Sequence, residues 1–412
     1  MSFKKYILMN QNIKVLEFNF DEELNVITEI LNIYNIDYAP YKLKCDYESN
    51  GKLEKSINNW YSGRGIPVYR DNLKEIMEQF NIDTTKELIN KHFALSLSDQ
   101  YWVKPSDLTI QWEEINYFDN TYNAVAFANA TFGENATSSI KDIFNNSSLD
   151  KFKTPNNTTD GQLKKVWLKV NGKNYLYKAS GTLYNFEPIN EVLASKMCEI
   201  LDVPYVKYSI DVIKSKRQDT LVSICECTIN KNQEIINAYN LLSDNKTENY
   251  MENYKKYLEI LELHNIPHAK EYIEKMFMLD YIMLNEDRHL NNFGIIRDVN
   301  SLDWISVCPI FDTGKSMNTN VSKNYWNFAE GEVKFFSPIL VSSEILTEIF
   351  TISISEKQIF ELKQLNQEYK KLLEQYREYT NLSQEQVQEL VEGYQERINV
   401  FESMMSKKGL IK

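Results

Sequence analysis

A β-hairpin is the sequence feature that most constrains the fold. Residues 163–170 alternate like a strand, and Asn171-Gly172 is the dipeptide that two-residue type I′ turns favour, because both positions need a positive φ. Residues 175–179 then have the pattern of the returning strand. We therefore expect an antiparallel hairpin that places Lys178 near the end of its second strand.

A helix and two further strands are expected after the hairpin. Apolar residues from Ile189 to Leu201 recur at the spacing of one helix face, and Pro204 limits the helix at its C-terminal end. Residues 206–213 and 220–228 have the pattern of strands joined by a polar turn, and the chain then becomes largely helical. The expected order is hairpin, helix, two strands and then helices.

The segment richest in polar turn formers, residues 145–161, predicts the main domain boundary. Residues 1–147 contain short strand-like and helical pieces, and we expect them to be an accessory region for a partner or for substrate specificity. Residues 148–230 would form a small β-rich lobe, and residues 231–412 a larger helical lobe. The expected fold class is therefore α+β, bilobal, with an extra N-terminal α+β region.

Composition excludes several classes of protein. A net charge of −12 argues against nucleic-acid binding by bulk electrostatics, which needs a basic face. Five scattered cysteines fit reduced thiols better than a disulfide framework, and Cys225 and Cys227 fit core thiols better than a metal site. No stretch approaches the roughly 20 apolar residues of a membrane span, and the N-terminus does not have the pattern of a signal peptide. We expect a cytoplasmic protein without direct contact to nucleic acid or membrane.

Two short motifs carry side chains suited to phosphoryl transfer from ATP. This reaction needs Mg²⁺ and a cation on the phosphates, and a carboxylate that orients the acceptor hydroxyl and takes its proton. An apolar helix at residues 272–284 runs into Asn285-Glu-Asp-Arg-His-Leu-Asn-Asn292, and a hairpin at residues 293–310 delivers Asp312-Thr-Gly314. Asp287 would be the catalytic carboxylate, while Asn292 and Asp312 offer oxygen ligands to Mg²⁺.

The upstream hairpin and helix supply the remaining parts of a nucleotide site. Lys178 would place its ammonium group on the α- and β-phosphates, and Glu191, in the first turns of the helix, would hold it by an ion pair. Glu226 and Cys227 end the last strand before the helical part, and we expect their backbone to receive the adenine.

The segments 285–294 (Asn-Glu-Asp-Arg-His-Leu-Asn-Asn-Phe-Gly) and 309–314 (Pro-Ile-Phe-Asp-Thr-Gly) resemble the signature of HipA-like serine/threonine kinases. The resemblance covers about residues 150–400, and it implies a protein-kinase-like fold with Asp287 as the catalytic residue and Asn292 and Asp312 on Mg²⁺. His289 would then have a structural role near the catalytic loop.

The same resemblance implies regulation and partners. Members of the family carry a phosphate-covering loop, and residues 158–165, with Gly161, match its position. Such loops are in some members autophosphorylated, which makes Thr158 and Thr159 candidate sites. Many members are toxins paired with an antitoxin, so a regulator protein is an expected partner beside the protein substrate. Residues 1 to about 150 do not match the family's best-known N-terminal subdomain.

Two alternatives stay open at the level of sequence. The chain could be a catalytically silent kinase-fold module that binds a partner through its N-terminal region. It could also be an active transferase of the same fold whose acceptor is not a protein or whose transferred group is AMP. Binding of Mg-ATP without turnover would favour the first alternative, and the mass of the modified product would identify the second.

Overall fold

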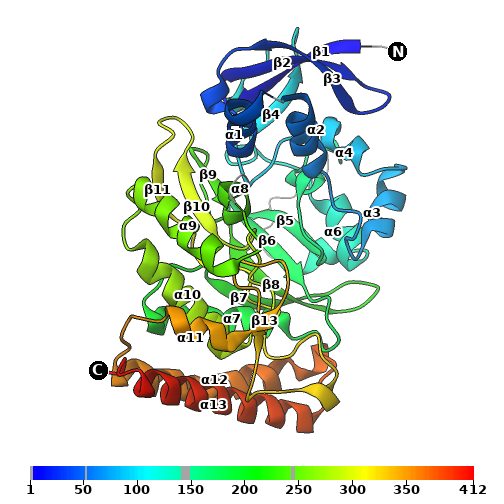
Figure 1. The fold of residues 1–412 in the computed structure, drawn as a ribbon. Coiled ribbons are helices and arrows are strands. Elements are labelled where there is room, and N and C mark those ends of the chain that lie inside the picture. Colours follow the sequence, from blue (N-terminus) through cyan, green and yellow to red (C-terminus); the bar gives the residue numbers. More distant parts are fainter. Residues whose placement is uncertain (1–2, 52, 141–148, 243–245) are drawn as a thin grey trace.

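The computed structural model describes residues 3–51, 53–140, 149–242 and 246–412, and within them the chain is mixed α and β. The N-terminal region forms a four-stranded antiparallel sheet of order β3-β2-β1-β4, which lies at the top of Figure 1. Its elements are β1 (Phe3–Asn10), β2 (Ile13–Asp21), β3 (Val26–Ile33), α1 (Tyr41–Asn50), α2 (Leu53–Gly63), α3 (Leu73–Phe80), α4 (Lys86–Lys91), β4 (Tyr101–Pro105), α5 (Trp112–Ile115) and α6 (Val125–Phe132).

A second four-stranded antiparallel sheet, of order β5-β6-β8-β7, carries the predicted hairpin. Asn171 and Gly172 both have positive φ, 49° and 79°, as the type I′ turn requires, so this prediction is confirmed. The helix α7 follows the hairpin and ends at Leu201, before an Asp202 cap with left-handed backbone. The elements are β5 (Lys165–Val170), β6 (Lys173–Ala179), α7 (Glu187–Leu201), β7 (Tyr208–Ile213) and β8 (Thr220–Glu226).

The rest of the chain is mainly helical, with three strands that the sequence pattern did not indicate, β9, β12 and β13. The first of them, β9, pairs with β10 in a three-stranded sheet of order β11-β10-β9. The long helices α12 and α13 lie side by side at the base of the molecule (Figure 1). The elements are β9 (Gln233–Asn237), α8 (Ala238–Leu242), α9 (Tyr250–Leu263), α10 (Ala269–Met283), β10 (Gly294–Asp298), β11 (Trp304–Val307), β12 (Glu332–Val333), β13 (Val341–Ser342), α11 (Leu346–Ile349), α12 (Glu356–Tyr376) and α13 (Gln384–Lys407).

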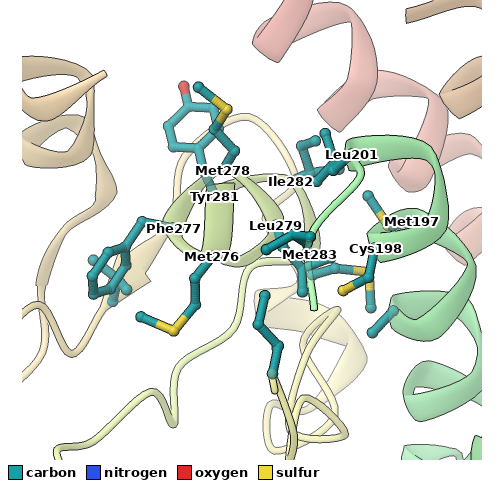
Figure 2. Close-up of a cluster of buried hydrophobic side chains, with 14 of the residues drawn as sticks. Met197, Cys198, Leu201, Met276, Phe277, Met278, Leu279, Tyr281, Ile282 and Met283 are labelled. Atoms are coloured by element: carbon teal, nitrogen blue, oxygen red, sulfur yellow. The ribbon is translucent and has the colours of Figure 1, made fainter. Parts of the chain in front are cut away.

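Helix α10 is apolar on most of its circumference because it runs through the centre of the helical part. Figure 2 shows side chains of α7 facing this helix, with Leu201 beside Ile282 and Cys198 near Met283. Close packing of this kind fixes the end of α10 in space. The loop that follows, which contains Asp287, therefore starts from a rigid support.

The N-terminal region is packed against the second sheet rather than set apart from it. Ile7 of β1 and Trp102 of β4 belong to the same buried cluster as Val166 and Leu168 of β5. The predicted boundary between residues 147 and 148 falls in residues 141–148, outside the described part of the chain. The shared core means that the N-terminal region and the second sheet stabilise each other.

The N-terminal region also contacts the connection that leads from β8 to β9. Gln100 donates to the carbonyl of Asn230 at 3.0 Å, and Gln11 donates to that of Lys231 at 2.8 Å. Behind this connection, Arg297 of β10 forms a buried ion pair with Glu234 of β9, and the Tyr101 hydroxyl lies 3.3 Å from both groups. The N-terminal region thus holds the second sheet and the helical part in one arrangement.

No helix among the described residues is long and apolar enough to cross a membrane.

The N-terminal region predicts a specific pH dependence of stability. His92 is hydrogen-bonded through Nδ1 to the Tyr117 hydroxyl at 2.8 Å, and burial lowers the pKa of His92 to about 4. An unfolded histidine titrates near 6.5, so between these two pH values only the unfolded state gains a proton. The stability that neutral His92 contributes is therefore present above about pH 6.5 and is lost as the pH falls towards 4.

We expect thermal unfolding of a His92→Gln variant to lose this part of the pH dependence. The wild-type midpoint should fall more steeply from pH 7 to pH 5 than the midpoint of the variant. His268→Gln is the matched control, because His268 is exposed at the start of α10. Parallel curves for wild type and His92→Gln would contradict the assignment.

Candidate active site

The centre of the candidate site is a buried lysine between two carboxylates from distant parts of the chain. Lys178 of β6 donates to Asp312 Oδ1 at 2.6 Å and also to Glu191 Oε1 of α7. Burial opposes the charged lysine, but the two carboxylates outweigh it and hold the pKa of Lys178 above its usual value. The predicted ion pair between Lys178 and Glu191 is thus present in the structure. Lys178 is charged and held in one position.

Asp312 lies on a tight turn after β11 whose backbone is unusual. Its φ is +56°, a left-handed conformation that a residue with a side chain adopts only when its surroundings impose it. Glu191 Oε2 accepts the backbone N–H of the next residue, Thr313, at 2.9 Å. Burial alone would raise the pKa of Asp312, but the ammonium groups of Lys178 and Lys165 hold it below its usual range. The carboxylate is therefore ionised, as a metal ligand must be.

A buried ion pair that sequence reasoning did not identify connects this turn with the Asp287–Asn292 loop. Arg288 donates through Nε and Nη2 to both oxygens of Asp280 in α10, at 2.9 and 3.0 Å, and neither side chain is exposed. The same guanidinium donates to the carbonyls of Asn292 and Phe311, at 3.1 and 2.6 Å. Arg288 therefore fixes the Asp287–Asn292 loop against the Asp312 turn. Asp280 gave no signal in the sequence beyond its place in an apolar helix.

Hydrogen bonds within the loop orient the two candidate side chains, Asp287 and Asn292. Asn292 Nδ2 donates to the backbone carbonyl of Asp287 at 2.8 Å, which leaves the amide oxygen as the atom available to a cation. The backbone N–H of Asp287 donates to the side chain of Asn285 at 3.0 Å. His289 is half-buried beside them, and burial lowers its pKa, so the neutral form is favoured.

Two further lysines flank the carboxylate of Asp287. Lys334 Nζ lies 2.7 Å from Oδ1, and Lys315 Nζ lies 3.3 Å from Oδ2. Lys315 directly follows Asp312-Thr-Gly314, so its position was open to inference from the sequence. Lys334 stands 47 positions after Asp287 and has no local signal at all.

The oxygen atoms of Asn292 and Asp312 fit Mg²⁺. Carboxylate and amide oxygens are the ligands that hard divalent cations prefer, and Mg²⁺ at such sites takes its other ligands from phosphates and water. The described residues contain no cluster of three or more His, Cys, Asp and Glu side chains that could hold a metal ion.

The segment that contains Gly161 passes close to the side chain of Lys165. Gly161 has a φ of +96°, and a Cβ there would come within 2.3 Å of the Lys165 ammonium, so the backbone approaches this cation closely. Burial lowers the pKa of Lys165 to about 8. Arg70, a buried residue of the N-terminal region, donates to the carbonyl of Thr159 and holds the start of the segment.

Thr158 and Thr159 are buried in this arrangement. Thr158 donates its hydroxyl to the Leu95 carbonyl at 2.6 Å, and Thr159 donates to the Pro155 carbonyl at 3.1 Å. Neither hydroxyl can reach the γ-phosphate of a bound ATP while these hydrogen bonds persist. Phosphorylation of either residue therefore requires the segment to move. Phosphorylation of Thr158 or Thr159 stays a prediction, and it now requires that the segment leave this position.

The two residues expected to receive adenine lie at the end of β8. Glu226 is exposed, and its carboxylate pairs with Lys173 across the sheet at 3.0 Å. The backbone N–H of Cys227 donates to the Asn174 carbonyl at 2.8 Å, and its thiol contacts the Leu97 carbonyl. The Cys227 N–H is thus committed within the protein. Cys225 and Cys227 are both free thiols, as the sequence indicated.

Comparison with known proteins gave matches to solved structures alone. No protein-family model matches the chain, and no curated protein does. Among solved structures, the chain is similar to the proinflammatory kinase CtkA of Helicobacter pylori, at 17% identity and a TM-score of 0.42, over 60% of this chain and 95% of that one. It is also similar to the Shewanella oneidensis MR-1 toxin–antitoxin system HipA, HipB and operator DNA complex, at 10% identity and a TM-score of 0.46, over 98% of each chain.

Proposed function

We propose that this protein is a Mg²⁺-dependent, HipA-like serine/threonine protein kinase with a bilobal catalytic fold. The observation that carries the proposal is the convergence of Lys178, Glu191 and Asp312 in one buried ion-pair cluster, with the Asp287–Asn292 loop tied to it by Arg288. These residues come from a strand, a helix and two loops that are far apart in the sequence. A structural ion pair alone would not need the additional oxygen ligands or the second carboxylate beside it.

Each residue of the candidate site would have a separate role in phosphoryl transfer. Lys178 would bind the α- and β-phosphates, and Asn292 and Asp312 would hold Mg²⁺ through oxygen atoms. Asp287 would orient the acceptor hydroxyl and take its proton as the oxygen bonds to the γ-phosphorus. When bound, Mg-ATP supplies the phosphoryl group, and the bond from γ-phosphorus to the bridging oxygen breaks with its electron pair leaving on ADP. Lys165 and the Gly161 segment would shield the phosphates from water.

The proposal predicts transfer of label from γ-labelled ATP to protein in the presence of Mg²⁺. Chelation of the metal should abolish this transfer, because Asn292 and Asp312 would then hold no cation against the phosphates. Mass spectrometry of the product checks the acceptor and the transferred group. One added phosphate on Ser or Thr is the expected result. An AMP adduct, a small-molecule product, or binding of Mg-ATP without any turnover would each contradict the protein-kinase assignment.

The partner and the biological role extend the same proposal. The resemblance of residues 285–294 and 309–314 to HipA-like kinases supports a toxin role with a regulator or antitoxin as partner. The solved HipA neighbour is itself in complex with HipB. Growth of cells that express the wild-type chain, compared with cells that express an inactive variant, tests the toxin role. Equal growth of both would count against it.

A further inference from the structure

The catalytic loop raises the question of which cation binds the terminal phosphate. Within the Asp287–Asn292 segment, the single arginine is fully buried and its guanidinium is committed to Asp280, Thr313 and two backbone carbonyls. Lys178, which Glu191 and Asp312 hold in place, is already assigned to the α- and β-phosphates. The cation must therefore come from outside the motif.

Lys315 lies between Asp287 and the segment that contains Gly161. Its ammonium group lies 3.3 Å from Asp287 Oδ2 on one side and 3.5 Å from Gln162 Oε1 on the other. Gln162 directly follows Gly161, whose backbone passes close to Lys165. Lys315 thus bridges the Asp287 carboxylate and the segment that contains Gly161 and Gln162. The Lys315 side chain is 23% exposed, so a ligand can reach it.

Lys334 has a different environment. Its ammonium group lies closer to Asp287, at 2.7 Å from Oδ1, and it belongs to the segment just after β12. Its charge also acts on the half-buried carboxyl of Glu286. The shorter contact and the additional acidic neighbour favour a lysine that stays on Asp287. The longer contact of Lys315 is the one that a competing anion displaces more easily.

We propose that Lys315 binds the γ-phosphate of ATP and that Lys334 is a positioning residue that keeps the Asp287 carboxylate in place. The proposal rests on the proposed function for its ligand. A lysine that turns from Asp287 Oδ2 to the phosphate leaves that oxygen to the acceptor hydroxyl, so one side chain serves both tasks. Charge-assisted contacts to phosphate are among the stronger polar interactions in proteins.

Calorimetric titration with two Mg²⁺ complexes tests the assignment without any turnover. The probes are ADP and the β,γ-imido analogue of ATP, which differ by the terminal phosphoryl group. For Lys315→Met, we expect the affinity for the analogue to fall by about tenfold or more, because losing a hydrogen bond to a charged group weakens binding by about that factor. Affinity for ADP should change by less than about twofold. Lys315→Arg should restore most of the preference for the analogue, because it keeps the charge.

Two further variants serve as controls. Lys334→Met should leave the ratio of the two affinities unchanged. Lys323→Met should change neither affinity, because Lys323 pairs with Glu385 and Glu389 on the surface of α13. Equal losses for both nucleotides in Lys315→Met, or no loss, would overturn the proposal. A selective loss in a protein that never transfers phosphate would support the Lys315 assignment while the kinase proposal fails.

Discussion

Asp287→Asn should nearly abolish phosphoryl transfer while the protein stays folded. The substitution keeps the size of the side chain and the backbone contact to Asn285, but it removes the group that takes the acceptor's proton. It also leaves Lys315 and Lys334 without their shared carboxylate. Loss of a general base costs on the order of 10²–10⁴-fold in rate. The measurement is the initial rate of label transfer from γ-labelled ATP at saturating Mg²⁺.

The same substitution at an exposed site provides the control. Asp303 lies in the turn between β10 and β11, within the same hairpin that delivers Asp312, and its side chain is exposed. Asp303→Asn should transfer phosphate at the wild-type rate. Undiminished transfer by Asp287→Asn would exclude Asp287 as the catalytic carboxylate. Thermal unfolding of both variants separates a loss of chemistry from a loss of fold.

The hairpin, α7 and α10 could be predicted because their signals are local. Asn171-Gly172 specifies a turn by the φ values it permits. The apolar residues of α7 recur at helix spacing, and α10 stands out as a nearly continuous apolar segment. These elements also carry Lys178 and Glu191 and lead into Asp287. The centre of the candidate site therefore follows from short-range patterns and motif spacing.

Strand β9 could not be predicted because one of its two buried positions carries a charged residue. Glu234 and Ile236 are the residues of this strand that face inward, and Glu234 is buried only because Arg297 of the neighbouring strand pairs with it. A charged residue at an inward position breaks the alternation that marks a strand. The compensating arginine is 63 positions away and cannot be found without the fold.

The same limit applies to the residues that support the site. Lys334 and Asp280 reach Asp287 and Arg288 through packing, not through spacing, so a motif that starts at Asn285 does not include them. Arg70 holds the Thr159 segment from a region whose role the sequence left open. Motifs identify the atoms that meet a ligand, whereas the contacts that hold those atoms depend on the tertiary structure.

Asp280→Asn should cause a large loss of stability, although it changes a residue that would touch no substrate. Asp280 and Arg288 are both fully buried, and the carboxylate accepts from Nε, from Nη2 and from Asn285 Nδ2. An asparagine cannot neutralise the guanidinium, so the variant leaves a buried charge unpaired. Breaking a buried pair in this way costs about 3–5 kcal/mol. Urea unfolding of the variant and the wild type measures the difference in the free energy of unfolding.

Glu271→Gln on the same helix is the matched control for Asp280→Asn. Glu271 pairs with Lys275 at 2.8 Å, and the Glu271 side chain is 44% exposed. Ion pairs exposed to solvent contribute about 0–1 kcal/mol. If both variants lost the same stability, the buried pair would have no special role. A double-mutant cycle with Arg288→Met then isolates the coupling between the two charges. Coupling near zero would mean that the Asp287–Asn292 loop is held by its backbone contacts, and that Arg288 binds the Asn292 and Phe311 carbonyls without help from Asp280.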